Sequence, residues 1–280
     1  MSPSQQQIEK KKSQAVWGAT PAGSSHAMEF EPGTKDFFLQ SYRIRSTQEL
    51  PFLKEIVPFE SFRGKKVLEV GCGVGYDAYE FCSYGAVYTG IDITLENPGR
   101  CRSHLRLFGF EPSVMVADGE FLPCKDTTTD VIYSNGVLHH TPDIMRSFSE
   151  VHRVLRPEGE FWVILYHRNS VFHWLTVIMF DYILTLGFLR HTYRERLSMI
   201  EYTTSNVRPL VNVYSKSEVR LLLESAGFRT DQLWVRRLTK DDFPNAPVLK
   251  ILWAWIPKQW MDWLGTKWGW YVIAKATKRP

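Results

Sequence analysis

The chain has 280 residues, of which 44% are hydrophobic and 23% charged, a composition typical of a globular protein with one α/β domain of roughly 200 residues and some additions. The net charge of +4 at pH 7 is too small to indicate nucleic-acid binding by itself, and most basic residues alternate with acidic ones. The four cysteines form no CxxC pair and no histidines show metal-ligand spacing, so we expect reduced thiols, a cytoplasmic protein and no metal site.

The N-terminal part is expected to lie outside the main domain. Residues 1–33 begin with a polar stretch that lacks the apolar core of a secretory signal, so we predict a flexible segment. Trp17 is an apolar side chain within this polar segment, and with Pro21 and Gly23 it forms a candidate lid over a cofactor. Residues 34–64 are predicted to hold one or two helices, because apolar residues recur at helical spacing as far as Pro58.

The remaining residues, 65–280, alternate between strand-like and helix-like segments. This alternation predicts an α/β fold with a doubly wound, parallel, seven-stranded sheet that binds its ligand at the carboxyl ends of the strands. The expected strands are 65–70, 86–92, 112–118, 129–137, 160–168, 228–239 and 268–278. The expected helices are 75–85, 97–109, 143–155 and 215–227, with an α-helical insertion at about 170–212 after strand five.

The first strand runs directly into the glycine turn "EVGCGVG", residues 69–75. Glycines allow a sharp turn close to a ligand, and Asp92 at the end of the second strand can accept hydrogen bonds from ribose hydroxyls. A nicotinamide cofactor would need G-x-G-x-x-G, but here the third glycine comes one position early. Acidic residues at Glu69 and Asp77 would also oppose a pyrophosphate. The turn therefore favours a zwitterionic cofactor with a cationic centre.

Several motifs together resemble those of a known family. The segments "VLEVGCGVGYD", "YTGID", "VADGEFLPCKDTTTDVIYSNGVLHHTPD" and "EVHRVLRPEGEFWVI" are similar to the successive motifs of class I S-adenosylmethionine-dependent methyltransferases. The resemblance extends over about residues 60–240 and is greatest to the small-molecule group that includes ubiquinone and sterol methyltransferases. It implies the Rossmann-like methyltransferase fold and S-adenosyl-L-methionine as the cofactor.

The resemblance also implies which residues contact this cofactor. The turn would cradle its methionine part, Asp92 its ribose and Ile93 its adenine, while Asp118 would contact the adenine amino group. Asn135 and Gly136 would lie beneath the methionine part. The complete set of expected cofactor residues is Glu69, Gly71, Cys72, Gly73, Gly75, Asp77, Asp92, Ile93, Asp118, Gly119, Asn135, Gly136 and Trp17.

Four residues at the ends of strands four and five are candidates for the acceptor side. A methyl acceptor must be aligned with the methyl group and, where required, lose a proton. His140 is the first candidate for the base, because histidine titrates near neutrality and this residue follows strand four. His139 and His167 are further candidate catalytic residues, and Tyr166 could orient the acceptor.

The insertion and the C-terminal region are unusually apolar. Residues 171–189 are nearly long enough to cross a bilayer, but His173 and Asp181 interrupt them, so we expect a buried, substrate-covering or membrane-touching helix instead. The aromatic residues Phe172, Trp174, Phe180 and Tyr182 indicate an apolar or aromatic acceptor, and Trp253, Trp255, Trp260 and Trp263 near lysines resemble an interfacial membrane face.

These observations predict a methyltransferase that acts on an O or N atom of a small, lipophilic or aromatic molecule, with C-methylation less favoured. Its partner is expected to be a small-molecule acceptor, with peripheral membrane contact and no nucleic acid, since strand four is not followed by an Asn-Pro-Pro-aromatic motif. The alternative is a methyltransferase-like fold that uses the cofactor for another reaction or serves as a non-catalytic membrane-associated partner. The residues do not indicate an oligomeric state.

Overall fold

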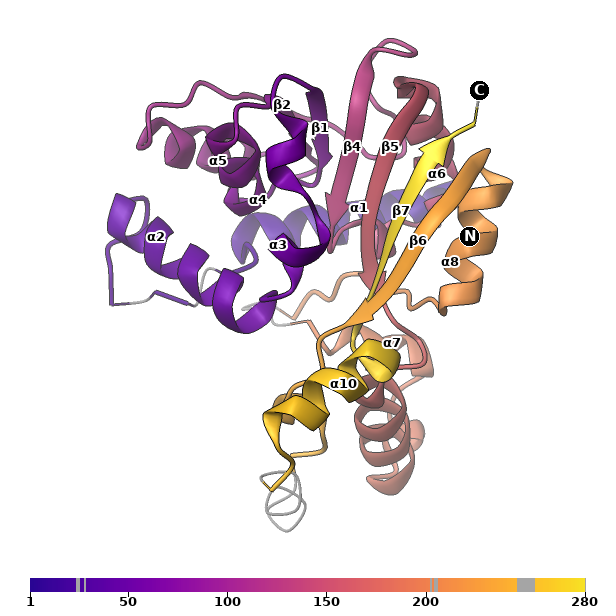
Figure 1. Ribbon diagram of the computed structural model, residues 1–280. Helices are drawn as coiled ribbons and strands as arrows, with labels where there is room; N and C mark the ends of the chain where they lie inside the picture. The colour runs from indigo at the N-terminus through magenta and orange to yellow at the C-terminus, as the bar shows by residue number, and fades with distance from the viewer. Residues whose placement is uncertain (24–25, 28, 202, 204–205, 246–254, 280) are drawn as a thin grey trace.

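In the computed structural model of the protein, the described residues are 1–23, 26–27, 29–201, 203, 206–245 and 255–279. They form a seven-stranded sheet with helices on both faces (Figure 1). The strands are β1 (Lys66–Val70), β2 (Val87–Asp92), β3 (Ser113–Val116), β4 (Thr129–Asn135), β5 (Leu155–Tyr166), β6 (Phe228–Arg236) and β7 (Tyr271–Lys278).

The strand order in the sheet is β3-β2-β1-β4-β5-β7-β6, which confirms the predicted doubly wound, seven-stranded α/β fold. Strands β1 to β5 pair in parallel, as the alternation of strands and helices predicts. The expectation of an entirely parallel sheet is wrong for β7, which runs antiparallel to both β5 and β6. The segment between β6 and β7 therefore returns the chain in the opposite direction, instead of making the crossover that a parallel neighbour needs.

Two apolar layers pack on the sheet. The helices between and after the strands are α4 (Tyr76–Ser83), α5 (Asn97–Arg106), α6 (Ile144–Val154) and α8 (Lys216–Ser225), and a short 3-10 helix, η3 (Leu138–His140), follows β4. Residues of α6 and α8 form one core with the sheet, whereas residues of α4 and α5 form the other. Burial of both faces explains why the central strands read as continuous apolar runs.

The N-terminal region is more ordered than expected. Within residues 1–33, where we predicted a flexible segment, the chain forms α1 (Pro3–Ala19). A capping box explains its start, because Ser2 accepts a hydrogen bond from the backbone of Gln5 and the Gln5 side chain bonds back to Ser2. Helices follow, as the pattern of 34–64 predicts: α2 (Lys35–Ile44), the π-helix η1 (Arg45–Glu49), α3 (Leu53–Ile56) and the 3-10 helix η2 (Phe59–Phe62).

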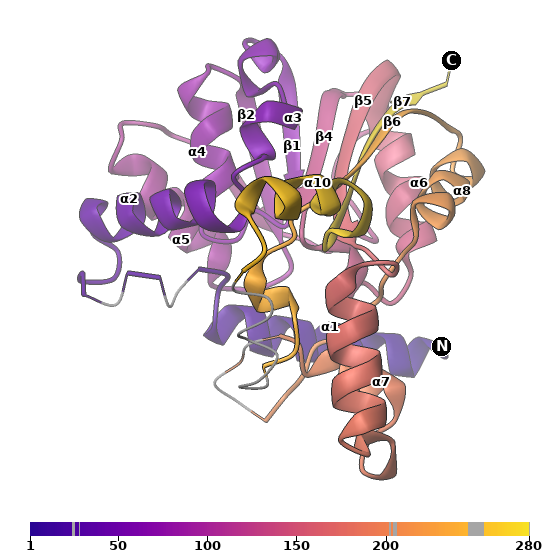
Figure 2. The same cartoon turned by 60° about the horizontal axis from the view of Figure 1, so that its bottom comes forward.

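The insertion after β5 is helical, as predicted, and projects beyond the carboxyl ends of β4 and β5 (Figures 1 and 2). It contains the π-helix η4 (Phe172–Leu184), the 3-10 helix η5 (Gly187–Leu189) and α7 (Tyr193–Ser198). Among the described residues, no helix combines the length and apolar character that crossing a bilayer requires. The expectation of a buried helix holds only for its inner face, since Trp174 and Leu184 are exposed.

The segment between β6 and β7 includes the 3-10 helix η6 (Lys240–Asp242) and α10 (Lys258–Trp268). The inner side of α10 packs through Met261 and Leu264 against Leu238 and the base of η4. Three of the four tryptophans highlighted in the sequence, Trp255, Trp260 and Trp263, are exposed, whereas Trp253 lies outside the described residues.

Candidate functional site

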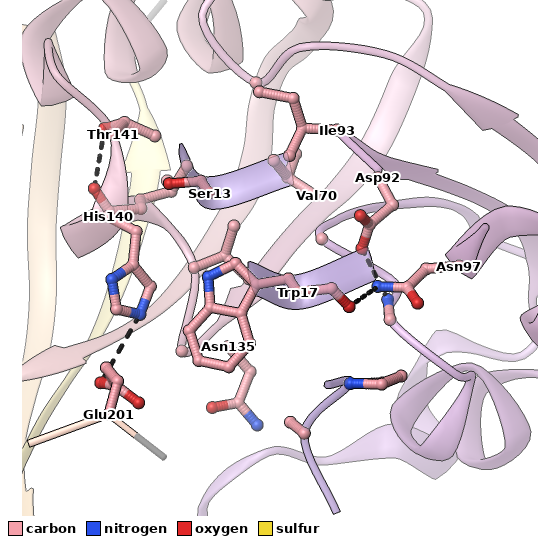
Figure 3. A pocket seen from close by; sticks show the side chains of 18 of the residues that line it. Ser13, Trp17, Val70, Asp92, Ile93, Asn97, Asn135, His140, Thr141 and Glu201 are labelled. Carbon is pink, nitrogen blue, oxygen red and sulfur yellow. Dashed lines mark hydrogen bonds and ion pairs between the residues drawn. The ribbon is translucent and has the colours of Figure 1, made fainter. Parts of the chain in front are cut away.

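A cavity of about 390 Å³ lies at the carboxyl ends of the central strands, where parallel α/β sheets bind their ligands. Its volume falls within the range of small-molecule sites, about 300–1,000 Å³. Figure 3 shows part of its lining, to which α1, the strand ends and the insertion all contribute. Eleven of the predicted site residues line it: Trp17, Gly71, Gly73, Asp92, Ile93, Asp118, Gly119, Asn135, Gly136, His140 and Tyr166.

The glycine turn forms one wall of the cavity. Gly71 has φ of 86°, and a Cβ atom placed there would lie 2.2 Å from a Val137 methyl carbon. Gly73 has φ of 51°, and a Cβ atom there would meet nothing within 4 Å. The backbone at Gly73 therefore faces open space inside the cavity, which is the property a ligand cradle requires.

Asp92 is held in one orientation at the end of β2. Its Oδ2 accepts a hydrogen bond from the Gly73 backbone N–H at 2.9 Å, and its Oδ1 accepts bonds from the Thr94 backbone and hydroxyl, each at 2.9 Å. The carboxylate is buried yet lines the cavity (Figure 3). These contacts join the glycine turn to β2 and present a fixed acceptor to a ligand.

Asp118, at the end of β3, is bound to α1. Lys10 Nζ lies 2.6 Å from Asp118 Oδ2 and 2.5 Å from Glu120 Oε2, and Asp118 Oδ1 also accepts the Glu120 backbone N–H. Burial alone would lower the pKa of Lys10, but hydrogen bonds and attraction to the two carboxylates outweigh it and raise the pKa. The lysine therefore stays charged and holds α1 against the sheet.

Helix α1 covers one side of the cavity. The Trp17 carbonyl accepts a hydrogen bond from Asn97 Nδ2 at 3.3 Å, and Gln14 Nε2 donates to the Ile93 carbonyl at 3.1 Å. The Trp17 ring lies over His140, with 5.2 Å between ring centroids. Pro21 and Gly23, which complete the candidate lid, also line the cavity.

Asp77 lies behind the cavity wall and forms the centre of a buried polar network. It pairs with Arg45, and its Oδ2 accepts hydrogen bonds from the Tyr133 hydroxyl and Asn135 Nδ2, both at 2.9 Å. Because Arg45 balances its charge, Asp77 cannot by itself attract a cationic ligand. We therefore correct that electrostatic reasoning: this acid orients Asn135, which does line the cavity.

Glu69 is also buried and lies outside the lining. Its Oε2 accepts a hydrogen bond from the Tyr88 hydroxyl at 2.5 Å, while burial and the nearby Asp77 raise its pKa well above the ordinary value. Cys72 and Gly75 pack against Cys101 on α5, where a Cβ at Gly75 would lie 3.0 Å from the Cys101 sulfur. These residues shape the turn from behind instead of contacting the cavity.

His140 lines the cavity next to Trp17 and Glu201. Its Nδ1 lies 2.6 Å from the Leu210 carbonyl oxygen, so Nδ1 donates and Nε2 keeps its lone pair. Nε2 lies 3.8 Å from Glu201 Oε1, and neither of these buried atoms has a hydrogen-bond partner among the described residues. Burial lowers the pKa of His140, although Glu201 opposes this effect, so the imidazole is predominantly neutral near pH 7.

The other three candidate residues, Tyr166, His167 and His139, lie in different surroundings. Tyr166 lines the cavity, and burial followed by the nearby Glu201 raises its pKa well above the ordinary value. His167 points the other way, as alternation along a strand requires, and its Nδ1 contacts the Gly269 carbonyl at 3.0 Å. His139 is fully buried against Tyr166, with ring centroids 3.7 Å apart. Neither histidine lines the cavity.

The predicted aromatic cover does not reach the cavity. Phe172 packs on Trp270, Trp174 is exposed, and neither lines the described cavity. Within the described part of the insertion, Glu201 is the residue that does so. Sequence reasoning missed Glu201 and the other charged lining residues Lys10, Arg45, Glu49 and Arg237.

One group of three side chains within the described ranges could hold a metal ion. His139, His140 and Glu201 place one ligand atom each within 4.8 Å of one another. Two imidazoles and a carboxylate form a donor set suited to a divalent transition metal. Spacing along the chain could not indicate this group, because Glu201 lies far beyond the two histidines.

Comparison with known proteins agrees with this geometry. Residues 68–163 match the family model described as "Methyltransferase domain". The chain is 33% identical over 121 residues to the sterol 24-C-methyltransferase ERG6B of Gibberella zeae; this aligned region covers 42% of this chain and 30% of that protein. It is 26% identical over 134 residues to the ubiquinone biosynthesis O-methyltransferase of Coxiella burnetii, covering 48% and 57%. The chain thus spans less than two thirds of these relatives.

A solved structure extends the likeness of fold over nearly the full length. The magnesium protoporphyrin IX methyltransferase ChlM of Synechocystis, determined with bound SAH, superposes with a TM-score of 0.59 over 96% of this chain and 99% of that chain. The sequence identity is only 14%, so this likeness concerns the fold.

Proposed function

We propose that the chain, whose residues 68–163 match the methyltransferase-domain model, is a class I S-adenosylmethionine-dependent methyltransferase. It transfers the cofactor's methyl group to an O or N atom of a small, lipophilic or aromatic molecule. The observation that carries this proposal is the cavity itself, which is lined both by Gly73 and Asp92, the proposed cofactor residues, and by His140 and Glu201, the proposed acceptor-side pair. When bound, S-adenosyl-L-methionine supplies an electrophilic methyl group on a sulfonium.

The residues of the cavity fit this cofactor. Asp92 offers a fixed carboxylate that would accept the hydrogen bonds of the two ribose hydroxyls, and Ile93 would contact the adenine. The open backbone at Gly73 leaves room for the methionine part. Asp118 is already paired with Lys10 of α1. We therefore propose that it contacts the adenine amino group while still paired with this lysine, and not as a free carboxylate.

We propose that His140 removes the acceptor's proton. Its neutral ring presents the Nε2 lone pair, and the Leu210 carbonyl fixes the tautomer that makes this possible. Glu201, 3.8 Å away, would stabilise the imidazolium that forms. Trp17 covers this side, and exclusion of water would strengthen these interactions.

The lining favours an acceptor with an apolar or aromatic body and a polar group. Trp17, Leu50, Tyr166 and Tyr271 supply apolar surface. Arg237 also lines the cavity; Asp242 balances its charge, but its guanidinium still offers N–H donors to a polar group of the acceptor. The names of the relatives refer to sterol and ubiquinone, which agrees with a lipophilic acceptor. Such a molecule partitions into membranes, so the proposal includes peripheral membrane contact.

Release of S-adenosylhomocysteine tests the proposal. The protein would be incubated with S-adenosylmethionine and a panel of lipophilic phenols, quinols and amines in detergent micelles, with Asp92→Asn as the cofactor-binding control. Turnover on at least one acceptor, and its loss in the variant, is expected. Cofactor binding without turnover on any panel member would favour the alternative of a non-catalytic or differently reacting protein.

A further inference from the structure

We propose that the projecting turn of the insertion, residues 183–189, together with the outer face of α10, forms a membrane-docking surface that binds the protein to an anionic lipid bilayer. This inference rests on the proposed function, because it explains how a lipophilic acceptor would reach the cavity. It names the surface and its partner, neither of which follows from the methyltransferase domain.

The end of the insertion exposes apolar side chains in succession. We call this group the apolar tip; it consists of Ile183, Leu184, Leu186, Phe188 and Leu189, which are 43%, 66%, 53%, 48% and 70% exposed. Soluble proteins rarely expose so many large apolar side chains together. Leu186 also has φ of 56°, a left-handed conformation that is uncommon for a residue other than glycine, asparagine or aspartate. The turn thus places an exposed, apolar leucine at a position where glycine or asparagine is usual.

A second exposed group lies on the neighbouring α10. Trp260 and Trp263 are 65% and 55% exposed, and Lys267 Nζ lies 4.5 Å from the centroid of the Trp263 ring. We call these two residues the tryptophan face. The inner side of α10 packs against the base of η4, so the two elements are neighbours. Both lie at the end of the sheet where the cavity is found (Figures 1 and 2).

The chemistry of this surface fits a bilayer. Aliphatic side chains at a projecting turn can enter the acyl region, while tryptophans beside lysines suit the headgroup level. Arg190 and Arg194 follow the apolar tip and are exposed. Of the nearby acids, Asp181 pairs with Arg196, Asp262 pairs with Lys258, and Glu195 caps α7. Glu195 keeps its negative charge as a cap, but the cations Arg190, Arg194 and Lys267 outnumber it. The net charge of this surface is therefore positive and complementary to anionic lipid.

The position of the insertion also fits contact with a bilayer. The helical insertion projects away from the sheet in both views (Figures 1 and 2). Beside the apolar tip, a hollow is lined by Tyr182, Phe188 and Arg190, among others. A projecting turn with exposed aliphatic side chains can enter the apolar phase of a bilayer.

Sedimentation with large vesicles tests the proposal on the full chain. The wild type should bind phosphatidylcholine vesicles that contain phosphatidylglycerol more tightly than pure phosphatidylcholine vesicles. The double variant Leu186→Ser/Leu189→Ser should bind them about tenfold more weakly, because binding scales with buried apolar area. Leu221→Ser is the matched control: Leu221 is 65% exposed, but it lies on α8, away from the apolar tip.

Three results would overturn the proposal. These are no vesicle binding by the wild type, equal binding by the double variant and the control, or a dimer in light scattering that the double variant abolishes. S-adenosylhomocysteine binding by each protein is measured in parallel. If the wild type binds S-adenosylhomocysteine but does not associate with vesicles, only the docking surface is refuted. If the wild type does not bind S-adenosylhomocysteine, the proposed function is refuted.

Discussion

Asp92→Asn is the substitution that most sharply tests the cofactor geometry. The side chain keeps its shape, but it loses its charge and one of its acceptor atoms. In the native site, three N–H and O–H donors from Gly73 and Thr94 already converge on the carboxylate. An amide must turn its NH₂ group toward one of these sets of donors, so the variant weakens both the ligand contact and the junction between the glycine turn and β2.

The magnitude follows from the number of contacts. Hydrogen bonds to charged groups contribute about 1.5–3 kcal/mol each, whereas neutral ones contribute about 1 kcal/mol. If both ribose hydroxyls bond to Asp92, loss of the charge costs about 1 kcal/mol for each bond. The resulting 2 kcal/mol corresponds to roughly a 30-fold weaker Kd. Isothermal titration with S-adenosylhomocysteine measures this change directly.

Thr94→Val provides the matched control. Thr94 donates its hydroxyl to Asp92 but does not line the cavity. The variant keeps the charge at position 92. It loses two hydrogen bonds of the Thr94 hydroxyl, the one donated to Asp92 and the one accepted from the Asn97 backbone N–H, but no bond to the ligand, so we expect a change in Kd of less than about threefold. The reasoning is refuted if Asp92→Asn binds as tightly as the wild type, or if Thr94→Val weakens binding equally while both remain folded by circular dichroism.

Three further predictions concern the acceptor side, the metal question and α1. His140→Gln should lower turnover by about 10²–10⁴-fold with unchanged S-adenosylhomocysteine affinity, since a base acts on the chemical step; a change in affinity alone would contradict this role. Dialysis against EDTA should leave turnover unchanged, whereas loss that zinc restores would instead make His139, His140 and Glu201 metal ligands. Lys10→Met should lower the free energy of unfolding in urea by about 3 kcal/mol, because Glu120 is only 1% exposed and loses its cationic partner, keeping only the hydrogen bond from the Asp143 backbone. Lys10→Arg should recover most of this loss, and equal losses would exclude the ion pair as the cause.

Local patterns predicted much of the fold and several of the residues that line the cavity. The glycine turn and Asp92 lie close in sequence to the strands that position them, so strand-turn-helix order was enough to place them at one sheet edge. The alternation of β5 also separates Tyr166 from His167, although sequence alone did not show which face held the cavity.

The residues that sequence reasoning missed depend on long-range packing. Lys10 and Glu201 join the site from α1 and the insertion, and no motif spacing connects them to β3 or β4. Helix α1 was predicted as flexible because its composition is polar, but ion pairs and hydrogen bonds to the sheet edge stabilise it instead of an apolar face. The direction of β7 likewise depends on pairing with β5, which a strand pattern cannot reveal.

The central claim is that the cavity binds S-adenosylmethionine and not a nicotinamide cofactor. Isothermal titrations of the wild type with S-adenosylhomocysteine and with NAD⁺, in the same buffer, test this most directly. The geometry of the glycine turn and Asp92 predicts saturable binding of S-adenosylhomocysteine, one molecule per chain, and no binding of NAD⁺. Saturable binding of NAD⁺ with no heat from S-adenosylhomocysteine would contradict it.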